Sequence, residues 1–211
     1  MKRLLALLLA FTMTFSISFS ATALAAETSN VPSDKIIRLT DCPAGQTITI
    51  PVGDAEYIDD GNGKLIKISD LPTFSNQQEA NSFISGLRNA LSNPIQHDPM
   101  SEYATMSTNG NHKVASITYN YTTTIALWVE YTTSGNSNTG KVTYHNAYTT
   151  LSGYTLGVSW HEITCHSEVT SSGKDIYASA TGNLVYYLLI EDLLEVGREV
   201  VNLSGYCAVI H

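Results

Sequence analysis

Apolar residues recur at every second position through most of the C-terminal half of this chain. The alternation begins near residue 113 and runs through segments 115–121, 125–131, 156–160, 176–180 and 200–210, with turns rich in Gly, Ser and Asn between them. Successive side chains of a strand point to opposite faces, so the pattern predicts strands with one buried and one wet face. We therefore expect residues 113–211 to form a mainly β domain, an antiparallel β-sandwich or barrel of about seven strands.

Two departures from the alternation are informative. The run from Tyr186 to Ile190 is apolar at both parities, which predicts a central strand covered on both faces. Apolar residues fall on even positions up to Trp160 and on odd positions from Ile163. One inserted residue reverses the phase in this way, so we expect a β-bulge or a strand break between these two residues.

The N-terminal part, residues 27–95, mixes strand and helix patterns. Short strand-like runs at 36–39, 47–52 and 65–68 are followed or separated by turns. The turn from Asp59 to Gly63 contains Asn-Gly, which tolerates positive φ and favours a small β-hairpin. Residues 96–112 have no sustained periodicity and are expected to form a linker or loop.

One amphipathic helix is expected over about residues 76–92. Ser75 or Asn76 can cap its first turn, and Gln78 or Glu79 can complete a capping box. Its apolar residues recur at helical spacing, which predicts packing against a sheet. Asn93-Pro94 ends the pattern, because the residue before a proline avoids the helical conformation.

The first 26 residues have the layout of a secretory signal peptide. Lys2 and Arg3 precede an apolar run from Leu4 to Phe11, and Ala23-Leu24-Ala25 supplies the small-residue pattern that signal peptidase cleaves. We expect cleavage after Ala25 or Ala26 and a secreted or extracytoplasmic mature protein. The alternative is an uncleaved membrane anchor, but six Ser and Thr residues dilute the apolar stretch between positions 12 and 22.

Charge limits the partners of the mature chain. Loss of Lys2 and Arg3 with the leader changes the formal net charge from −8 to about −10. Nucleic acids and anionic membranes both need clustered Lys and Arg, so neither is expected as a partner.

Cysteine use leaves the redox state open. An oxidising compartment would allow one disulfide among Cys42, Cys165 and Cys207, with one thiol left over. We favour Cys165–Cys207, because both lie in the β-rich half. The alternative is three free thiols, two of them buried in that half.

Four patterns approach catalytic or metal-binding motifs, and each fails on geometry. In the run His161–His166 the second histidine stands one place beyond the i+4 position of a zinc protease, and strand residues four apart lie roughly 13 Å from each other. Gly157–His161 lacks the last glycine of a nucleophile elbow and no helix follows it. The adjacent Cys165 and His166 would face opposite sides of a strand. The twelve residues 59–70 have Lys64 where a calcium loop requires glycine. No metal and no cofactor are expected.

Histidines and carboxylates leave one enzymatic alternative open. Four histidines of the β half could meet across strands, although scattered positions on polar faces are the simpler expectation. A secreted hydrolase would use dispersed residues, and a pocket that brings a histidine to a carboxylate would support it. The groups available to a hydrolase are His97, Asp98, His145, His161 and Glu162, and the other two histidines of the β half are His112 and His166.

Aromatic side chains are the clearest indication of a binding surface. By parity Trp128 lies with Ala126 and Glu130, on the face opposite Leu127 and Val129. If that face is wet, Trp128 can stack on a sugar ring or anchor a protein, whereas the alternative is a strand covered on both faces. The candidate binding residues are Trp128, Tyr119, Tyr121, Tyr131 and His161.

These features favour an exported, non-catalytic, β-rich module that binds or scaffolds at the cell envelope or outside the cell. The expected partner is a cell-wall glycan or an envelope protein. The alternatives are the secreted hydrolase and a secreted toxin or antimicrobial protein. The acidic mature chain argues against an antimicrobial of the cationic, membrane-disrupting type.

Overall fold

The computed structural model describes residues 31–39, 42–61, 63–96, 109–119, 122–135 and 140–208. The expected signal peptide, residues 1–26, and most of the expected linker lie outside these ranges. The strands are β1 (Ile36–Arg38), β2 (Thr47–Pro51), β3 (Tyr57–Asp59), β4 (Leu65–Lys67), β5 (Thr73–Phe74), β6 (Ile95–Gln96), β7 (Asn109–Tyr119), β8 (Thr123–Ser134), β9 (Lys141–Ser152), β10 (Val158–Val169), β11 (Asp175–Ile190) and β12 (Leu193–Ala208). The helix is α1 (Gln77–Leu91), and two short 3₁₀ turns cover Ser33–Lys35 and Ile68–Asp70.

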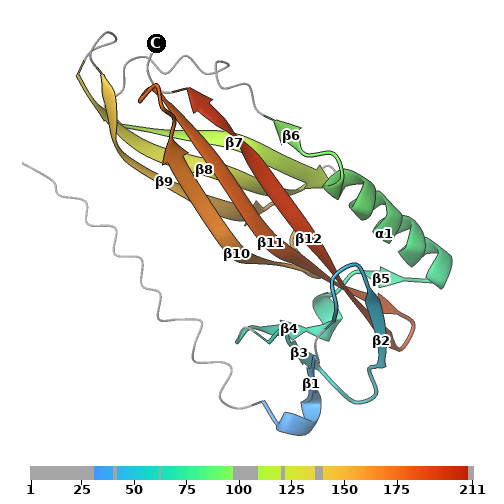
Figure 1. Ribbon diagram of the computed structural model, residues 1–211. Coiled ribbons are helices and arrows are strands. Elements are labelled where there is room, and N and C mark those ends of the chain that lie inside the picture. Colours follow the sequence, from blue (N-terminus) through green and yellow to red (C-terminus); the bar gives the residue numbers. More distant parts are fainter. Residues whose placement is uncertain are drawn as a thin grey trace, which may run out of the picture. The chain divides into compact units, whose positions relative to one another are not determined.

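Two open sheets stack face to face, as the alternation predicts (Figure 1). The larger has the order β10-β11-β12-β2, with β5 joining β11 beyond the end of β10. The smaller has the order β6-β7-β8-β9. The long strands β7 to β12 pair antiparallel with their neighbours. The sandwich prediction is therefore confirmed, and the barrel alternative is wrong because neither sheet closes on itself.

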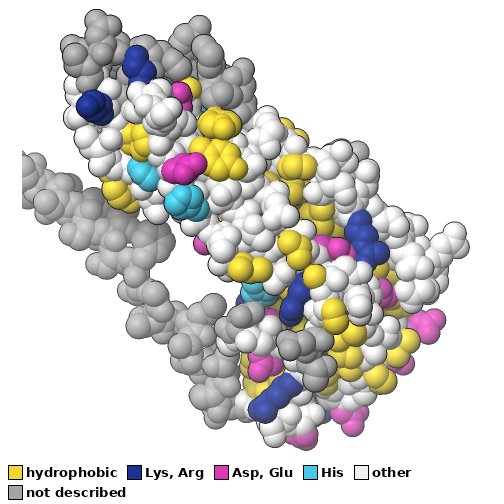
Figure 2. All heavy atoms as spheres, in the orientation of Figure 1, with side chains coloured by type: hydrophobic (Ala, Val, Ile, Leu, Met, Phe, Trp, Pro, Cys, Tyr) yellow, Lys and Arg dark blue, Asp and Glu magenta, His cyan; other side chains and the backbone are white. Residues whose placement is uncertain are grey.

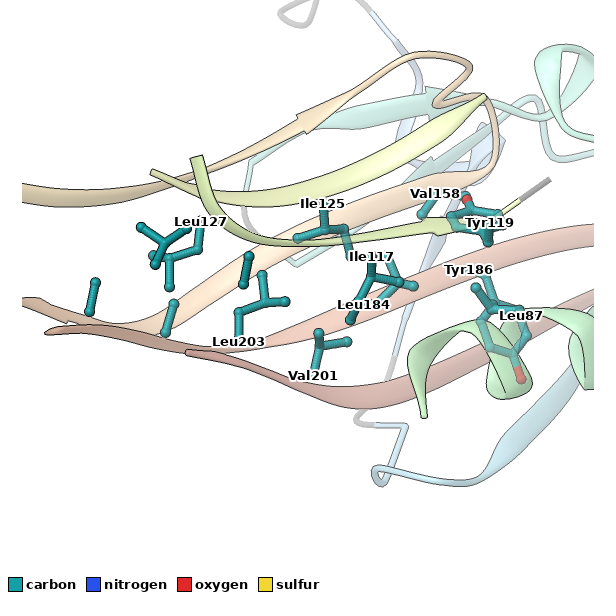
Figure 3. Close-up of a cluster of buried hydrophobic side chains, with 14 of the residues drawn as sticks. Leu87, Ile117, Tyr119, Ile125, Leu127, Val158, Leu184, Tyr186, Val201 and Leu203 are labelled. Atoms are coloured by element: carbon teal, nitrogen blue, oxygen red, sulfur yellow. The ribbon is translucent and has the colours of Figure 1, made fainter. Parts of the chain in front are cut away.

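The main core lies between these sheets and beneath α1. Ile117, Ile125 and Leu127 from the smaller sheet meet Leu184 and Leu203 from the larger one (Figure 3). All five side chains are almost fully buried. Burial of an aliphatic side chain of this size stabilises the fold by roughly 1.5–3 kcal/mol, so this layer is the main source of stability.

A second, smaller core lies on the opposite face of the larger sheet. The three-stranded sheet β1-β3-β4 and the chain around β2 cover Val185, Tyr187, Leu194 and Val196 there. From Leu184 to Ile190, the even-numbered residues of β11 enter the main core and the odd-numbered ones enter the second core. This double coverage confirms the central strand expected at 186–190 and explains why that run is apolar at both parities.

The helix forms where the capping signals predict it. The side chain of Asn76 accepts a hydrogen bond from the Glu79 backbone N–H at 3.0 Å, and the Glu79 carboxylate accepts one from the Ser75 N–H at 3.2 Å. Ala80, Ile84 and Leu87 are its buried residues. Within the described ranges no helix has the length and apolar content needed to span a membrane.

The phase reversal before Ile163 is a β-bulge, as predicted. Glu162 pairs with Gly182 of β11 and Thr164 pairs with Thr181, so Ile163 is the extra residue. Its side chain is 58% exposed. The inserted residue lets Trp160 and Cys165 both face the main core despite their different parity.

Two local predictions are wrong. The segments 176–180 and 186–190, expected as separate strands, form one strand, because Gly182 continues it and accommodates the Trp160 ring, 2.4 Å from where a Cβ would lie. The strand expected from residue 113 already begins at Asn109. The last strand, β12, is entered through Glu191, which has a φ of 54°. Merging the two runs leaves six long strands from β7 to β12 in place of seven.

Candidate binding surfaces

Two of the predicted binding tyrosines are core residues. Tyr119 is 5% exposed and packs edge-on against Phe83 of α1, with ring centroids 6.3 Å apart. Tyr131 is 4% exposed and fills the space above Gly110. Burial raises the pKa of both phenols, that of Tyr119 to about 12. Their predicted binding role is wrong, because both point toward the main core. Tyr121 lies outside the described residues.

Trp128 occupies the predicted outer face of β8, but its ring is already engaged. The Lys113 ammonium lies over the ring at 5.2 Å from the centroid, and the indole N–H donates to the Thr150 hydroxyl at 3.0 Å. Tyr148 pairs directly opposite it and accepts a hydrogen bond from Asn111 at 2.6 Å. Trp128 is half-buried, so a ligand would have to displace Lys113 to stack on that side of the ring.

A more open aromatic pair lies on the outer face of the larger sheet. Tyr177 of β11 pairs with Tyr206 of β12, and their ring centroids are 5.1 Å apart. Tyr206 is 55% exposed. On the adjacent strand β10, Glu168 pairs with Tyr177 and His166 pairs with Ser179, and both side chains are exposed. Figure 2 shows hydrophobic, histidine and acidic side chains together over this part of β10–β12. We call this surface the tyrosine face; it comprises Tyr177, Tyr206, His166, Glu168, Ser179, Ser204, Thr181 and Asn202.

The sequence analysis missed this surface although the signal was present. In β11 the even residues Ile176, Ala178 and Ala180 are apolar, whereas Tyr177 stands among Ser and Thr at odd positions. A tyrosine in a polar row of a strand is expected to lie on the wet face. Its partner Tyr206 could not be assigned without the register between β11 and β12.

The histidines and carboxylates considered for a hydrolase do not converge within the described residues. Glu162 points toward β9, where its carboxylate accepts from the Thr149 N–H at 3.2 Å, while the adjacent His161 faces the opposite side. His145 is within hydrogen-bond distance of Ser167, 2.8 Å from Nδ1 to Oγ, across the gap between β9 and β10. His97 and Asp98 lie outside the described ranges.

His161 instead lines two adjoining hollows, the first on the outer face of the larger sheet and the second at the edge formed by β10. The first encloses about 230 Å³ and is bordered by Asp60, Asn183, Tyr187 and Arg198. The second, about 490 Å³, shares Asp60 and His161 and also contacts Lys64, Ser159 and Trp160. We call the two together the hairpin pocket, because Asp60, Gly61 and Lys64, which follow β3, form one wall.

Strand register and turn geometry create this pocket. Val185 of β11 pairs with Ser159 of β10 on one side and Arg198 of β12 on the other, so both polar side chains stand in one row beside the second core. The turn is held by hydrogen bonds from the Gly61 N–H to Asp59 at 3.0 Å and from the Lys64 N–H to Asp60 at 3.1 Å. These bonds fix Asp60 at the pocket wall.

Three buried polar atoms beside the pocket have no hydrogen-bond partner among the residues that the structure describes. They are the Tyr187 hydroxyl, the Ser159 hydroxyl and Arg198 Nε. Tyr187 is fully buried and Ser159 is 6% exposed. The two hydroxyls are neighbours, but they do not meet in hydrogen-bonding geometry. An unsatisfied buried donor costs about 1–3 kcal/mol and is rare in native proteins.

Burial also sets the protonation of the pocket. It raises the pKa of Tyr187 far above that of a free tyrosine, so the phenol stays neutral. Loss of hydration is the main cause that lowers the pKa of His161, and the carboxylate of Asp60 opposes it. His161 is therefore neutral at pH 7.

The cysteines are three free thiols, and the predicted Cys165–Cys207 disulfide is wrong. Cys165 pairs with Ala180 of β11, which pairs with Leu203 of β12, four residues from Cys207. Two strand spacings alone amount to about 9.5 Å, beyond the Cα separation of up to about 6.8 Å that a disulfide bridges.

Comparison of the chain with protein-family models, with curated proteins and with solved structures finds no match.

Proposed function

We propose that this protein is an exported, non-catalytic binding module that holds a cell-wall glycan on its tyrosine face. The observation that supports it is the pairing of the half-buried Tyr177 with the exposed Tyr206 on the outer face of the larger sheet. Pyranose rings have an apolar face that packs against aromatic rings, and tyrosine adds a hydroxyl for the sugar's polar groups. The expected secretion signal supports the same setting.

The neighbours of the pair favour a glycan over a protein partner. Apart from His166 and Glu168, the tyrosine face contains hydroxyl and amide side chains. Thr181 donates a hydrogen bond to the Asn202 side chain at 2.8 Å, which fixes the Asn202 oxygen and leaves its amide nitrogen to donate. Protein interfaces favour an apolar centre ringed by polar groups, whereas this surface is polar up to the tyrosine rings.

Co-sedimentation of the mature protein with insoluble peptidoglycan and with chitin tests the proposal. We expect saturable binding to at least one of them. Tyr206→Ala should weaken it about tenfold, since loss of one stacked aromatic ring removes about 1.4 kcal/mol of binding free energy.

Trp128→Ala is the matched control, because it removes an aromatic residue from the other sheet, where Lys113 covers the ring. It should change glycan binding by less than about threefold. Failure of the wild-type protein to sediment with either polymer would exclude the glycan. If the protein binds envelope proteins and no glycan, the partner on the tyrosine face is a protein.

A further inference from the structure

We propose that the glycan held on the tyrosine face carries free, protonated amino groups. The proposed ligand chemistry concerns the same surface and therefore rests on the proposed function.

The two tyrosines share one row across the larger sheet with a carboxylate. Glu168 of β10 pairs with Tyr177 of β11, which pairs with Tyr206 of β12. Directly paired side chains on one face of a sheet have Cβ atoms about 5 Å apart. A sugar ring that packs on the tyrosine rings therefore lies beside the Glu168 side chain.

The carboxylate of Glu168 is available to a ligand. The side chain is exposed, and its oxygen atoms have no hydrogen-bond or ion-pair partner among the described residues. The neighbouring row across the three strands consists of His166, Ser179 and Ser204, which contain no carboxylate. Charge recognition of the sugar is thus concentrated at the row that contains the tyrosines.

The other charged residues at this end of the face lie further along the chain. Asp175 stands two residues before Tyr177 on the same face of β11, and its carboxylate accepts a hydrogen bond from the Ser172 hydroxyl at 3.2 Å. Lys174 lies in the turn before β11 and forms no ion pair with either carboxylate within the described ranges. Glu168 is therefore the charged group in direct register with the tyrosine rings.

A ring of tyrosine next to a carboxylate suits an ammonium group. A cation within about 6 Å of an aromatic centroid is attracted by the face of the ring. The same ammonium can donate a charge-assisted hydrogen bond to a carboxylate, because it has several N–H groups. A hydroxyl or acetamido group at that position of the sugar is uncharged and gains neither attraction in full.

The carboxylate also disfavours anionic glycans. A uronic acid or a phosphate on the sugar would bring a second negative charge next to Glu168, and like charges at this distance repel. The formal net charge of the chain, −8, acts in the same direction at longer range. An amino sugar with its nitrogen unacetylated is the ligand class that these charges favour.

Titration calorimetry of the mature protein at pH 7 with three soluble tetrasaccharides tests this assignment. The tetramers of glucosamine, N-acetylglucosamine and galacturonic acid have the same length and differ in charge. We expect the glucosamine tetramer to bind about fivefold more tightly than the acetylated one, and the galacturonic acid tetramer to bind least. Added salt should reduce the first difference, because it screens exposed charges.

Glu168→Gln should weaken binding of the glucosamine tetramer about threefold to fivefold and leave that of the acetylated tetramer within about twofold. The residue is exposed, so the variant should fold like the wild type. Glu130→Gln is the matched control, because it removes an exposed carboxylate from β8 in the other sheet. It should leave both affinities within about twofold.

The outcomes separate this assignment from the proposed function. Equal or tighter binding of the acetylated tetramer, or an unchanged preference in Glu168→Gln, overturns the amino sugar and leaves the glycan in place. Tighter binding of a tetralysine peptide than of the glucosamine tetramer overturns both. Absence of saturable binding of the glucosamine tetramer also overturns the amino sugar, and sedimentation with chitin or peptidoglycan then decides whether the glycan falls with it.

Discussion

The three thiols illustrate how position sets the chemistry of a residue. Burial is the main cause that raises the pKa of Cys165 to about 11 and that of Cys207 to about 12. Cys42 is 3% exposed and its pKa is raised as well. Only the thiolate is nucleophilic, so all three sulfurs are protonated and unreactive near neutral pH.

Thiol titration checks both the protonation and the pairing. At pH 8 the folded mature protein should react slowly with an aromatic disulfide reagent. After unfolding in guanidinium chloride without reductant, three thiols per molecule should react. A single reactive thiol after unfolding would contradict the sheet register described above, because it requires a disulfide.

The elements were predictable where a local signal decides them. The α1 cap, the bulge at Ile163 and the doubly covered run of β11 each follow from residues close together in the sequence. Strand continuity through Gly182 was not predictable, because that glycine faces the Trp160 ring of a neighbouring strand. The hairpin pocket was out of reach for the same reason, since Asp60, His161 and Arg198 come together only through tertiary structure. Of its residues only His161 was predicted from the sequence to be a binding residue.

Substitution of alanine for Gly197 in β12 and for Gly86 in α1 should change stability in opposite directions. A Cβ at Gly197 of β12 would lie 2.0 Å from the buried ring of Tyr186, so Gly197→Ala should destabilise the protein by about 1–3 kcal/mol. Gly86 in α1 is exposed, and a Cβ added there would have no neighbouring atom within 4 Å, so Gly86→Ala should stabilise the protein by about 0.5–1 kcal/mol.

Urea unfolding of both variants measures these free energies. Equal effects of the two substitutions would show that the Tyr186 contact is unimportant and that only the conformational entropy of glycine matters.

The whole molecule depends on one sheet with a core on each face. β2 pairs with β12 and β5 with β11, so segments from the N-terminal third complete the larger sheet of the C-terminal half. The small sheet β1-β3-β4 contributes Ile58, which is fully buried in the second core. The two cores share β11 and β12, and we therefore expect them to unfold together.

Ile58→Ala tests this coupling. The substitution should lower the unfolding free energy by about 2–5 kcal/mol. The decrease in unfolding free energy should be the same by far-ultraviolet circular dichroism and by tryptophan fluorescence, even though both tryptophans lie outside the N-terminal segment. The exposed Ile163 provides the control, and Ile163→Ala should change stability by no more than about 0.5 kcal/mol. Separate transitions by the two probes would mean that the N-terminal layer unfolds alone.

The bulge at Ile163 has a counterpart in β9, where Thr143 is the extra residue between Val142 and Tyr144. β9 and β10 are the outermost strands of their sheets on the side where Trp160 donates to Thr149. Unpaired strands of this length are templates on which other chains can add, the first step toward fibrils. A bulge in each of these edge strands, together with the Trp160–Thr149 hydrogen bond across the gap between them, disrupts the regular row of backbone groups with which another chain would pair.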